Sequence, residues 1–170
     1  MADSKANQLQ IKKLFGNNIE DILFTINGLR NTGNTQILPH LIKLLNQNKN
    51  TKVRKALTDF FNDIKSQEAV NEIVTALKNN EYLEIHNILL SACWQSGLDF
   101  SNYIDVFIDI FIKGSYLEAI EAFTVIENID KNVNGEIIES SISKLKSEIT
   151  SFEADKKELM VELVHVLKRM

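Results

Sequence analysis

Residues 31–64 carry the pattern that decides the fold: Asn31-Thr32-Gly33-Asn34-Thr35-Gln36-Ile37-Leu38-Pro39-His40-Leu41-Ile42-Lys43-Leu44-Leu45, a polar loop, and then Thr51-Lys52-Val53-Arg54-Lys55-Ala56-Leu57. Gly33 can supply a positive φ in the polar turn, and Asn34 or Thr35 can cap the helix that follows. Pro39 falls in the first turn of that helix, where its missing N–H does least harm. The stretch therefore predicts a helix, a polar loop and a further helix that begins at Val53.

The same unit of two amphipathic helices recurs along the chain. Intervals of 34, 32 and 34 residues separate the starts of the apolar stripes in the first helices, Ile19, Val53, Ile85 and Ala119. The stripes of the second helices keep similar offsets, at Leu38, Val70, Ile104 and Ile138. Self-similarity at a period of about 33 residues is typical of a helical solenoid. Tetratricopeptide arrays have a similar period, but their Trp, Gly and Tyr set is not repeated here.

These patterns predict an all-α chain that forms one right-handed α-solenoid domain of about four antiparallel helix pairs. The pairs occupy residues 17–147, between an N-terminal cap in residues 1–16 and a C-terminal capping helix in residues 148–170. Thr150 and Glu153 have the spacing of a capping box at the start of the last helix. The end of a solenoid exposes an apolar face that must be covered, so a cap is the favoured role of this helix. A dimerisation helix is the alternative.

Composition narrows the class of protein further. The chain has 170 residues, 44% of them hydrophobic, with one proline and six glycines, as expected for a helical domain with a sizeable core. The net charge is −4, so the chain lacks the excess of basic residues that attracts the phosphate backbone of nucleic acid. The first residues lack the apolar core of a signal peptide, and no stretch approaches the roughly 18 apolar residues of a membrane span. We therefore expect a cytoplasmic protein with neither nucleic acid nor membrane as its partner.

The segment from Leu29 to Leu45, together with Val53 and Arg54, resembles the HEAT-repeat family. The resembling features are Gly33-Asn34 before the second helix, Ile37-Leu38-Pro39 entering it, Leu41-Ile42-Lys43-Leu44-Leu45 along it, and Val53-Arg54 opening the next unit. The similarity is closest to the short bacterial HEAT-like repeats that also occur in phycobilin lyases. The resemblance implies stacked helix pairs in which the first helices lie outside and the second helices line a concave face.

No sequence motif indicates an enzyme, a cofactor site or a metal site. The sequence has no Gly-rich phosphate loop, zinc-binding His pair or nucleophile elbow, and His40, His86 and His165 are about one repeat or more apart. Asp105 and Asp109 share a helix face, a spacing that suits acid-base work or a cation, but a solvated face is the favoured interpretation. Cys93 is the only cysteine and falls in an apolar stripe, which predicts a small buried side chain.

Two places deviate from the repeat and are candidates for partner binding. Trp94 stands where other repeats have Gly28, Asn62 and Asn128, so we expect a partly exposed indole that either anchors a partner or covers a neighbouring helix. In the helix that begins at Ile104, Val106 and Ile112 replace the polar residues of the sibling helices. Either this helix is buried centrally, or these two side chains and Asp109 belong to a concave binding patch.

The leading hypothesis for function is a non-enzymatic scaffold that binds a protein or peptide along the ridge of second helices. Its candidate contacts are His40, Lys43, Glu72, Thr75, Trp94, Val106, Asp109 and Ile112, with Ser140 and Ser143 continuing the ridge. The reason is physical, since stacked helices present a long and shallow face that suits an extended partner. The alternatives are an enzyme or nucleic-acid-directed protein similar to HEAT-like DNA glycosylases or bilin lyases, and a homo-oligomer built through the C-terminal helix. Both a monomer and a dimer are compatible with the sequence.

Overall fold

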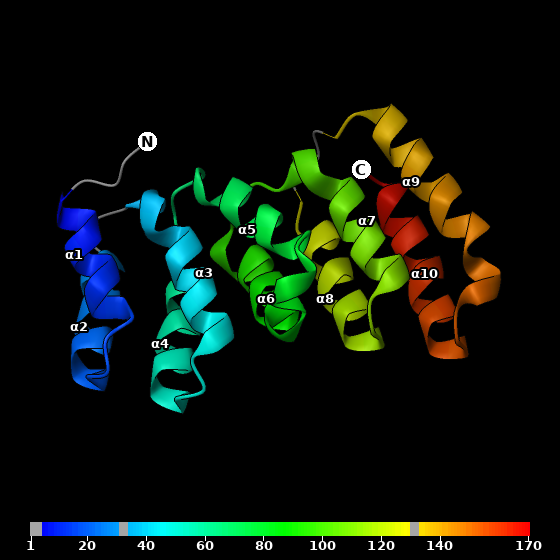
Figure 1. Ribbon diagram of the computed structural model, residues 1–170. Helices are drawn as coiled ribbons and strands as arrows, with labels where there is room; N and C mark the ends of the chain where they lie inside the picture. Colours follow the sequence, from blue (N-terminus) through cyan, green and yellow to red (C-terminus); the bar gives the residue numbers. More distant parts are fainter. Residues whose placement is uncertain (1–4, 31–33, 130–132) are drawn as a thin grey trace. The chain divides into compact units, whose positions relative to one another are not determined.

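The computed structural model describes residues 5–30, 34–129 and 133–170, and every regular element in these ranges is a helix (Figure 1). The prediction of an all-α chain is confirmed. Gly33 and its two predecessors in the quoted turn lie outside the described residues. The helices separate into two compact units, unit 1 (Met1–Leu98) and unit 2 (Asp99–Met170), and each is described by itself.

The helices of unit 1 are α1 (Lys5–Leu14), α2 (Ile19–Arg30), α3 (Leu38–Gln47), α4 (Thr51–Asn62), α5 (Ala69–Leu77) and α6 (His86–Ser96). Unit 2 contains α7 (Ile104–Lys113), α8 (Tyr116–Glu127), α9 (Gly135–Ser147) and α10 (Ala154–Leu167). Short 3-10 turns lead into several of them: η1 (Thr35–Ile37), η2 (Asn80–Ile85), η3 (Ser101–Tyr103) and η4 (Ile149–Ser151).

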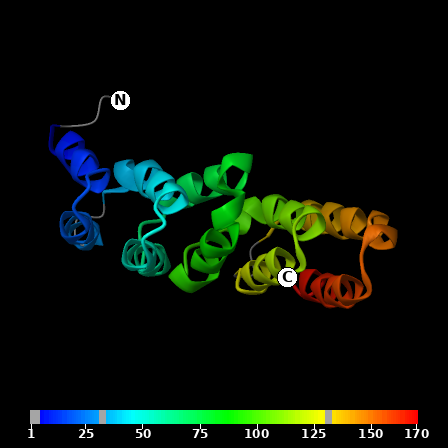
Figure 2. The same cartoon turned by 60° about the horizontal axis from the view of Figure 1, so that its bottom comes forward.

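Unit 1 is built from two rows of helices. Helices α1, α3 and α5 lie side by side in one row, and α2, α4 and α6 form the other (Figure 2). Among consecutive helices, contacts are most extensive within the hairpins α1–α2, α3–α4 and α5–α6. The two rows bury the apolar stripes that the sequence predicts, including Ile26, Leu41, Leu57 and Leu89.

Unit 2 repeats this arrangement on a smaller scale. Helix α7 packs on α8 and α9, and α10 packs on α8 and α9. The closest consecutive helices are α7–α8 and α9–α10, so the grouping is offset by one helix from the pairs that the stripes suggested. As a result, α1 and α10 each pack as one member of a helix pair.

Side-chain caps explain where several helices begin. Asn34 accepts a hydrogen bond from the backbone N–H of Gln36 and so caps η1, the turn that leads into α3. Helix α3 itself begins at Leu38 without a side-chain cap, so the predicted cap acts on the preceding turn. Asn50 caps α4, because its side chain accepts from the N–H groups of Lys52 and Val53 at 3.0 and 3.3 Å. This cap starts α4 at Thr51, two residues before Val53.

The capping box predicted at Thr150 is wrong. The Ser151 hydroxyl donates to the Glu148 carbonyl within η4, and Phe152 is extended and buried, so α10 begins only at Ala154. Glu153 precedes α10 without a side-chain cap. A capping box forms instead at the start of α8, where Ser115 and Glu118 exchange hydrogen bonds.

Polar side chains tie together helices about one repeat apart. These ties join residues 31 to 35 positions apart in the chain. In unit 1 they are Arg30–Asp63, Thr35–Glu68, Asn46–Glu81, Lys49–Glu84 and Lys65–Ser96, and in unit 2 Lys144–Asp109. The period of the sequence is therefore also present in contacts within each unit. Exposed pairs of this kind each contribute at most about 1 kcal/mol, so they specify register more than they stabilise.

Candidate partner-binding surfaces

Four of the predicted ridge residues lie on α3 and α5, which are neighbours in one row of unit 1. Lys43 and Thr75 are exposed, whereas His40 and Glu72 are half-buried. The His40 ring makes an edge-to-face contact with Phe15, with the ring centroids 6.5 Å apart. His40 therefore packs against the end of α1 and is less available than a fully solvated side chain.

Trp94 lies on α6 and is 36% exposed. The expectation of a partly exposed indole is confirmed. At the equivalent position of α2, Gly28 has open space where a side chain would stand. Trp94 thus fills a position that the first repeat leaves open, and part of its ring remains accessible.

The burial of Val106 rules it out as an exposed contact. Its side chain is 5% exposed, so of the two interpretations of this helix, burial is the one that the structure bears out at Val106. Ile112 is half-buried, and its carbonyl oxygen accepts a hydrogen bond from Lys156. Val106 and Ile112, which replace the polar residues of the sibling helices, are therefore explained by packing within the protein.

Asp109 is held by two lysines of unit 2. Lys113 on the same helix lies 3.3 Å away, and Lys144 reaches it from α9. Burial raises the pKa of Asp109, but the hydrogen bonds and charges of Lys144 and Lys113 outweigh it and hold the pKa below its usual value. The carboxylate therefore links α7 to α9. Within the described ranges, no group of three or more His, Cys, Asp or Glu side chains is placed to hold a metal ion.

Lys156 is a half-buried contact that sequence reasoning missed. Its ammonium donates to the carbonyls of Ile112 and Gly114 at 2.9 and 2.8 Å, where α7 ends. It also lies over the rings of Phe111 and Phe152, 5.9 and 5.2 Å from their centroids. Burial lowers the pKa of Lys156, and the nearby carboxylates of Glu118 and Glu153 oppose that shift. The residue spacing within α10 does not predict that Lys156 bonds to α7, because its acceptors are backbone carbonyls at the end of that other helix.

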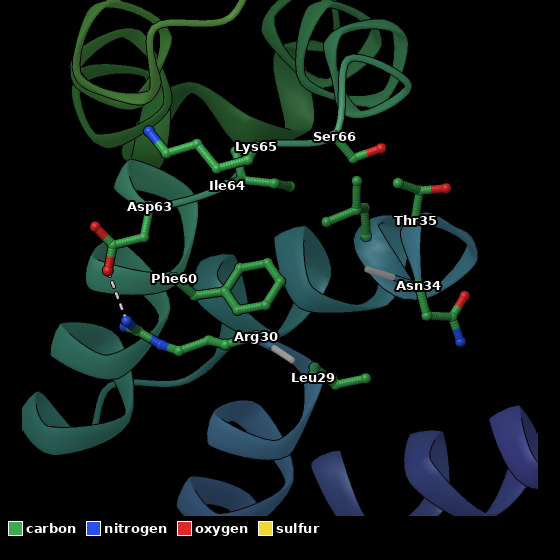
Figure 3. Close-up of a pocket in the computed structure, with 10 residues that line it drawn as sticks. Leu29, Arg30, Asn34, Thr35, Phe60, Asp63, Ile64, Lys65 and Ser66 are labelled. Carbon is green, nitrogen blue, oxygen red and sulfur yellow. Dashed lines mark hydrogen bonds and ion pairs between the residues drawn. The ribbon is translucent and has the colours of Figure 1, made fainter. Parts of the chain in front are cut away.

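An apolar pocket of about 250 Å³ opens in unit 1 where α2, α3 and α4 meet. Figure 3 shows the Phe60 ring directed into it, with Arg30 and Asp63 joined by an ion pair along one side. The pocket is lined by Leu29, Arg30, Asn34, Thr35, Leu38, Phe60, Asp63, Ile64, Lys65 and Ser66. Sequence reasoning did not find this site, because its walls come from three separate segments.

Several rim groups of this pocket are already engaged. Thr35 donates to Glu68 at 3.0 Å, and Lys65 turns to the carbonyl of Ser96 at 2.7 Å. Arg30 makes one 2.6 Å contact with Asp63, the only acceptor for its guanidinium among the described residues. Since a guanidinium carries five N–H donors, Arg30 keeps donors at the rim for another group.

A shallower groove, which we call the α8–α10 groove, lies on unit 2. It has a volume of about 590 Å³ and is lined by Tyr116, Asp155, Glu158, Leu159, Val161 and Glu162. Tyr116 and Val161 are 48% and 44% exposed, so large apolar groups meet solvent beside three carboxylates. Among the residues that the structure describes, no basic one lines the groove.

Charge is divided unevenly between the two units. Residues 99–170 contain 14 acidic and 8 basic side chains, whereas residues 1–98 contain 9 acidic and 11 basic ones. Unit 2 therefore has a net charge of −6 and unit 1 of +2. The net charge of the whole chain conceals this difference, which the sequence already contained.

Comparison with known proteins gives no assignment. A scan against models of protein families finds no match, and a search of curated proteins finds no significant relative. Among the helices in the described ranges, none combines the length and apolar character needed to cross a bilayer.

Proposed function

We propose that this protein is a non-enzymatic scaffold that binds a protein or peptide, and that its helix pairs form a right-handed α-solenoid of the HEAT-like kind. The two rows of helices within each unit and the polar ties at the repeat period support this architecture. Solenoids of stacked helices commonly present extended surfaces to partners.

The observation that carries the proposal is the apolar pocket of unit 1. At about 250 Å³ it is smaller than the roughly 300–1,000 Å³ typical of small-molecule sites, but it can take an apolar side chain from a peptide. Phe60 and Ile64 provide apolar contacts, while Arg30 offers donors to a peptide carbonyl or carboxylate at the rim. Such a pocket fixes one anchor residue of a partner, and the proposal assigns the exposed residues Lys43 and Thr75 of the ridge to further contacts.

The proposal is tested by filling the pocket from its rim. Ser66→Trp places a large side chain at the opening, and the turn there is kept by the backbone hydrogen bond from Ala69 to the Ser66 carbonyl. Gln47→Trp is the matched control, since Gln47 is an exposed residue of α3 outside the pocket. Both variants are expected to keep the helicity of the parent chain, as measured by circular dichroism.

The partner is found with a photo-crosslinking amino acid placed at Ser66 or at Gln47. A partner joined only from Ser66 is identified by mass spectrometry, purified and titrated against the parent chain by calorimetry. Ser66→Trp is expected to weaken binding at least about tenfold, and Gln47→Trp to leave it unchanged. Equal binding by both variants would overturn the assignment of this pocket.

A further inference from the structure

We propose that the α8–α10 groove binds a basic amphipathic helix of a partner protein. The inference deepens the proposed function, and rests on it, by naming a class of partner for a second surface that lies wholly within unit 2. Failure at the groove and failure at the pocket are therefore measured with different variants.

The groove offers apolar area that the chain does not cover. Tyr116 at the start of α8 and Val161 on α10 are both close to half exposed, and Leu159, which also lines the groove, is half-buried. Exposed apolar groups gathered in a concave site gain free energy when a partner removes them from water. This part of the groove suits the leucine-rich face of an amphipathic helix.

The charged part of the groove is purely acidic. Asp155 and Glu158 have no cationic partner among the described residues, and Glu162 has only the Nδ1 atom of His165, at 3.9 Å. Lys156, next to Asp155 in the chain, donates instead to carbonyls at the end of α7. The three carboxylates therefore attract a cationic ligand to the groove, and the net charge of −6 on unit 2 adds to this attraction.

The spacing of these carboxylates suits a helical ligand with several cationic side chains better than a ligand with a single charge. Asp155, Glu158 and Glu162 follow one another along about two turns of α10, so their side chains rise in steps of about one helical pitch of 5.4 Å. A partner helix with lysine or arginine one turn apart repeats the same step. The exposed Tyr116 ring adds a face on which one such cation can lie.

The probe for this site is a fluorescein-labelled synthetic helix of leucine and lysine, with its lysines one turn apart. A peptide with glutamate in place of each lysine is the control. Fluorescence anisotropy with the full chain is expected to show saturable binding of the lysine peptide only, weakening as salt is added.

Two variants of equal charge separate the groove from the overall field of unit 2. Glu158→Lys with Glu162→Lys is expected to weaken binding of the lysine peptide at least about tenfold. Glu136→Lys with Glu139→Lys, both exposed on α9, is expected to change it less than about twofold. Equal losses in both pairs would overturn the groove and leave only nonspecific attraction.

Further variants test the apolar contact and the occupant. Tyr116→Ala is expected to weaken binding about tenfold, whereas Leu117→Ala, exposed but outside the groove, is the neutral control. Glu158→Gln with Glu162→Gln removes charge with little change of shape, so its failure to weaken binding would also overturn the proposal. Sedimentation of the parent chain tests the other occupant: a dimer abolished by Glu158→Lys with Glu162→Lys would assign the groove to a second copy and overturn it.

Discussion

The ammonium of Lys156 on α10 donates to the carbonyl oxygen of Ile112 at 2.9 Å, and so satisfies an acceptor at the carboxyl end of α7. A positive charge at this end of a helix is favourable because it opposes the partial negative charge of the last carbonyls. The rings of Phe111 and Phe152 enclose the same ammonium. One side chain thus joins the last helix of the chain to α7.

Replacing Lys156 with methionine is expected to destabilise the protein by about 1–3 kcal/mol, because two backbone acceptors lose a charged donor while the apolar stem is kept. The free energy of unfolding is measured in urea. Lys157→Met, at an exposed neighbouring position, is expected to change it by less than about 0.5 kcal/mol. Equal effects at the two lysines would contradict the structural role of Lys156.

Asp109→Asn is expected to cost about 0.5–1 kcal/mol at neutral pH, since the carboxylate is partly exposed and paired with Lys113 and Lys144. The folded-state pKa of Asp109 is depressed, so its contribution is present above the unfolded pKa of about 3.9 and is lost as the pH falls through the folded pKa. Parent and variant should therefore converge in stability in acid. Urea titrations across this pH range provide the check, with Asp105→Asn as the matched variant.

Removal of the cap at Ser115 is expected to destabilise unit 2 by about 1 kcal/mol, because Ser115→Ala loses the side-chain half of the capping box with Glu118. Thr150→Ala has the same spacing to an acidic residue but no such box, and is expected to be nearly neutral. Thermal unfolding of the two variants compares them directly. A larger loss at Thr150 would show that α10 begins earlier in solution.

Gly114 and Gly28 are expected to respond oppositely to alanine. A Cβ at Gly114 would lie 2.7 Å from the Ile110 carbonyl oxygen, so Gly114→Ala should destabilise by about 1–3 kcal/mol. A Cβ at Gly28 meets nothing within 4 Å inside α2, and Gly28→Ala should stabilise by about 0.5–1 kcal/mol. Denaturation midpoints measure both changes, and the same sign for both would refute the packing described at these positions.

Periodicity alone predicted the helices and most of their buried faces. The stripe through Leu41 and Leu45 is buried in α3, and Cys93 is buried in α6 as expected from its register. Trp94 was placed at a partly exposed position by comparison with Gly28. All of these predictions were confirmed for the same reason: the side of a helix on which a residue lies follows from its position in the sequence relative to the other residues of that helix.

The surfaces could not be predicted in the same way. The pocket beside Phe60 and the α8–α10 groove are built from side chains of different helices, whose relative placement no spacing within one helix encodes. The contact of Lys156 is with backbone carbonyls, which leave no mark in the sequence. The charge difference between the two units, by contrast, is encoded in the sequence, and it predicts an acidic surface on unit 2.

The ties between residues 31 to 35 positions apart also bear on how the chain folds. Each of these long-range links closes a loop of similar, modest length, and the entropy lost on closure grows only with the logarithm of that length. None of these links requires the two ends of its unit to come together before it can form. If the helix pairs stack as in the proposed solenoid, folding is expected to begin at any pair and to spread to the next, because each pair contacts only its neighbours.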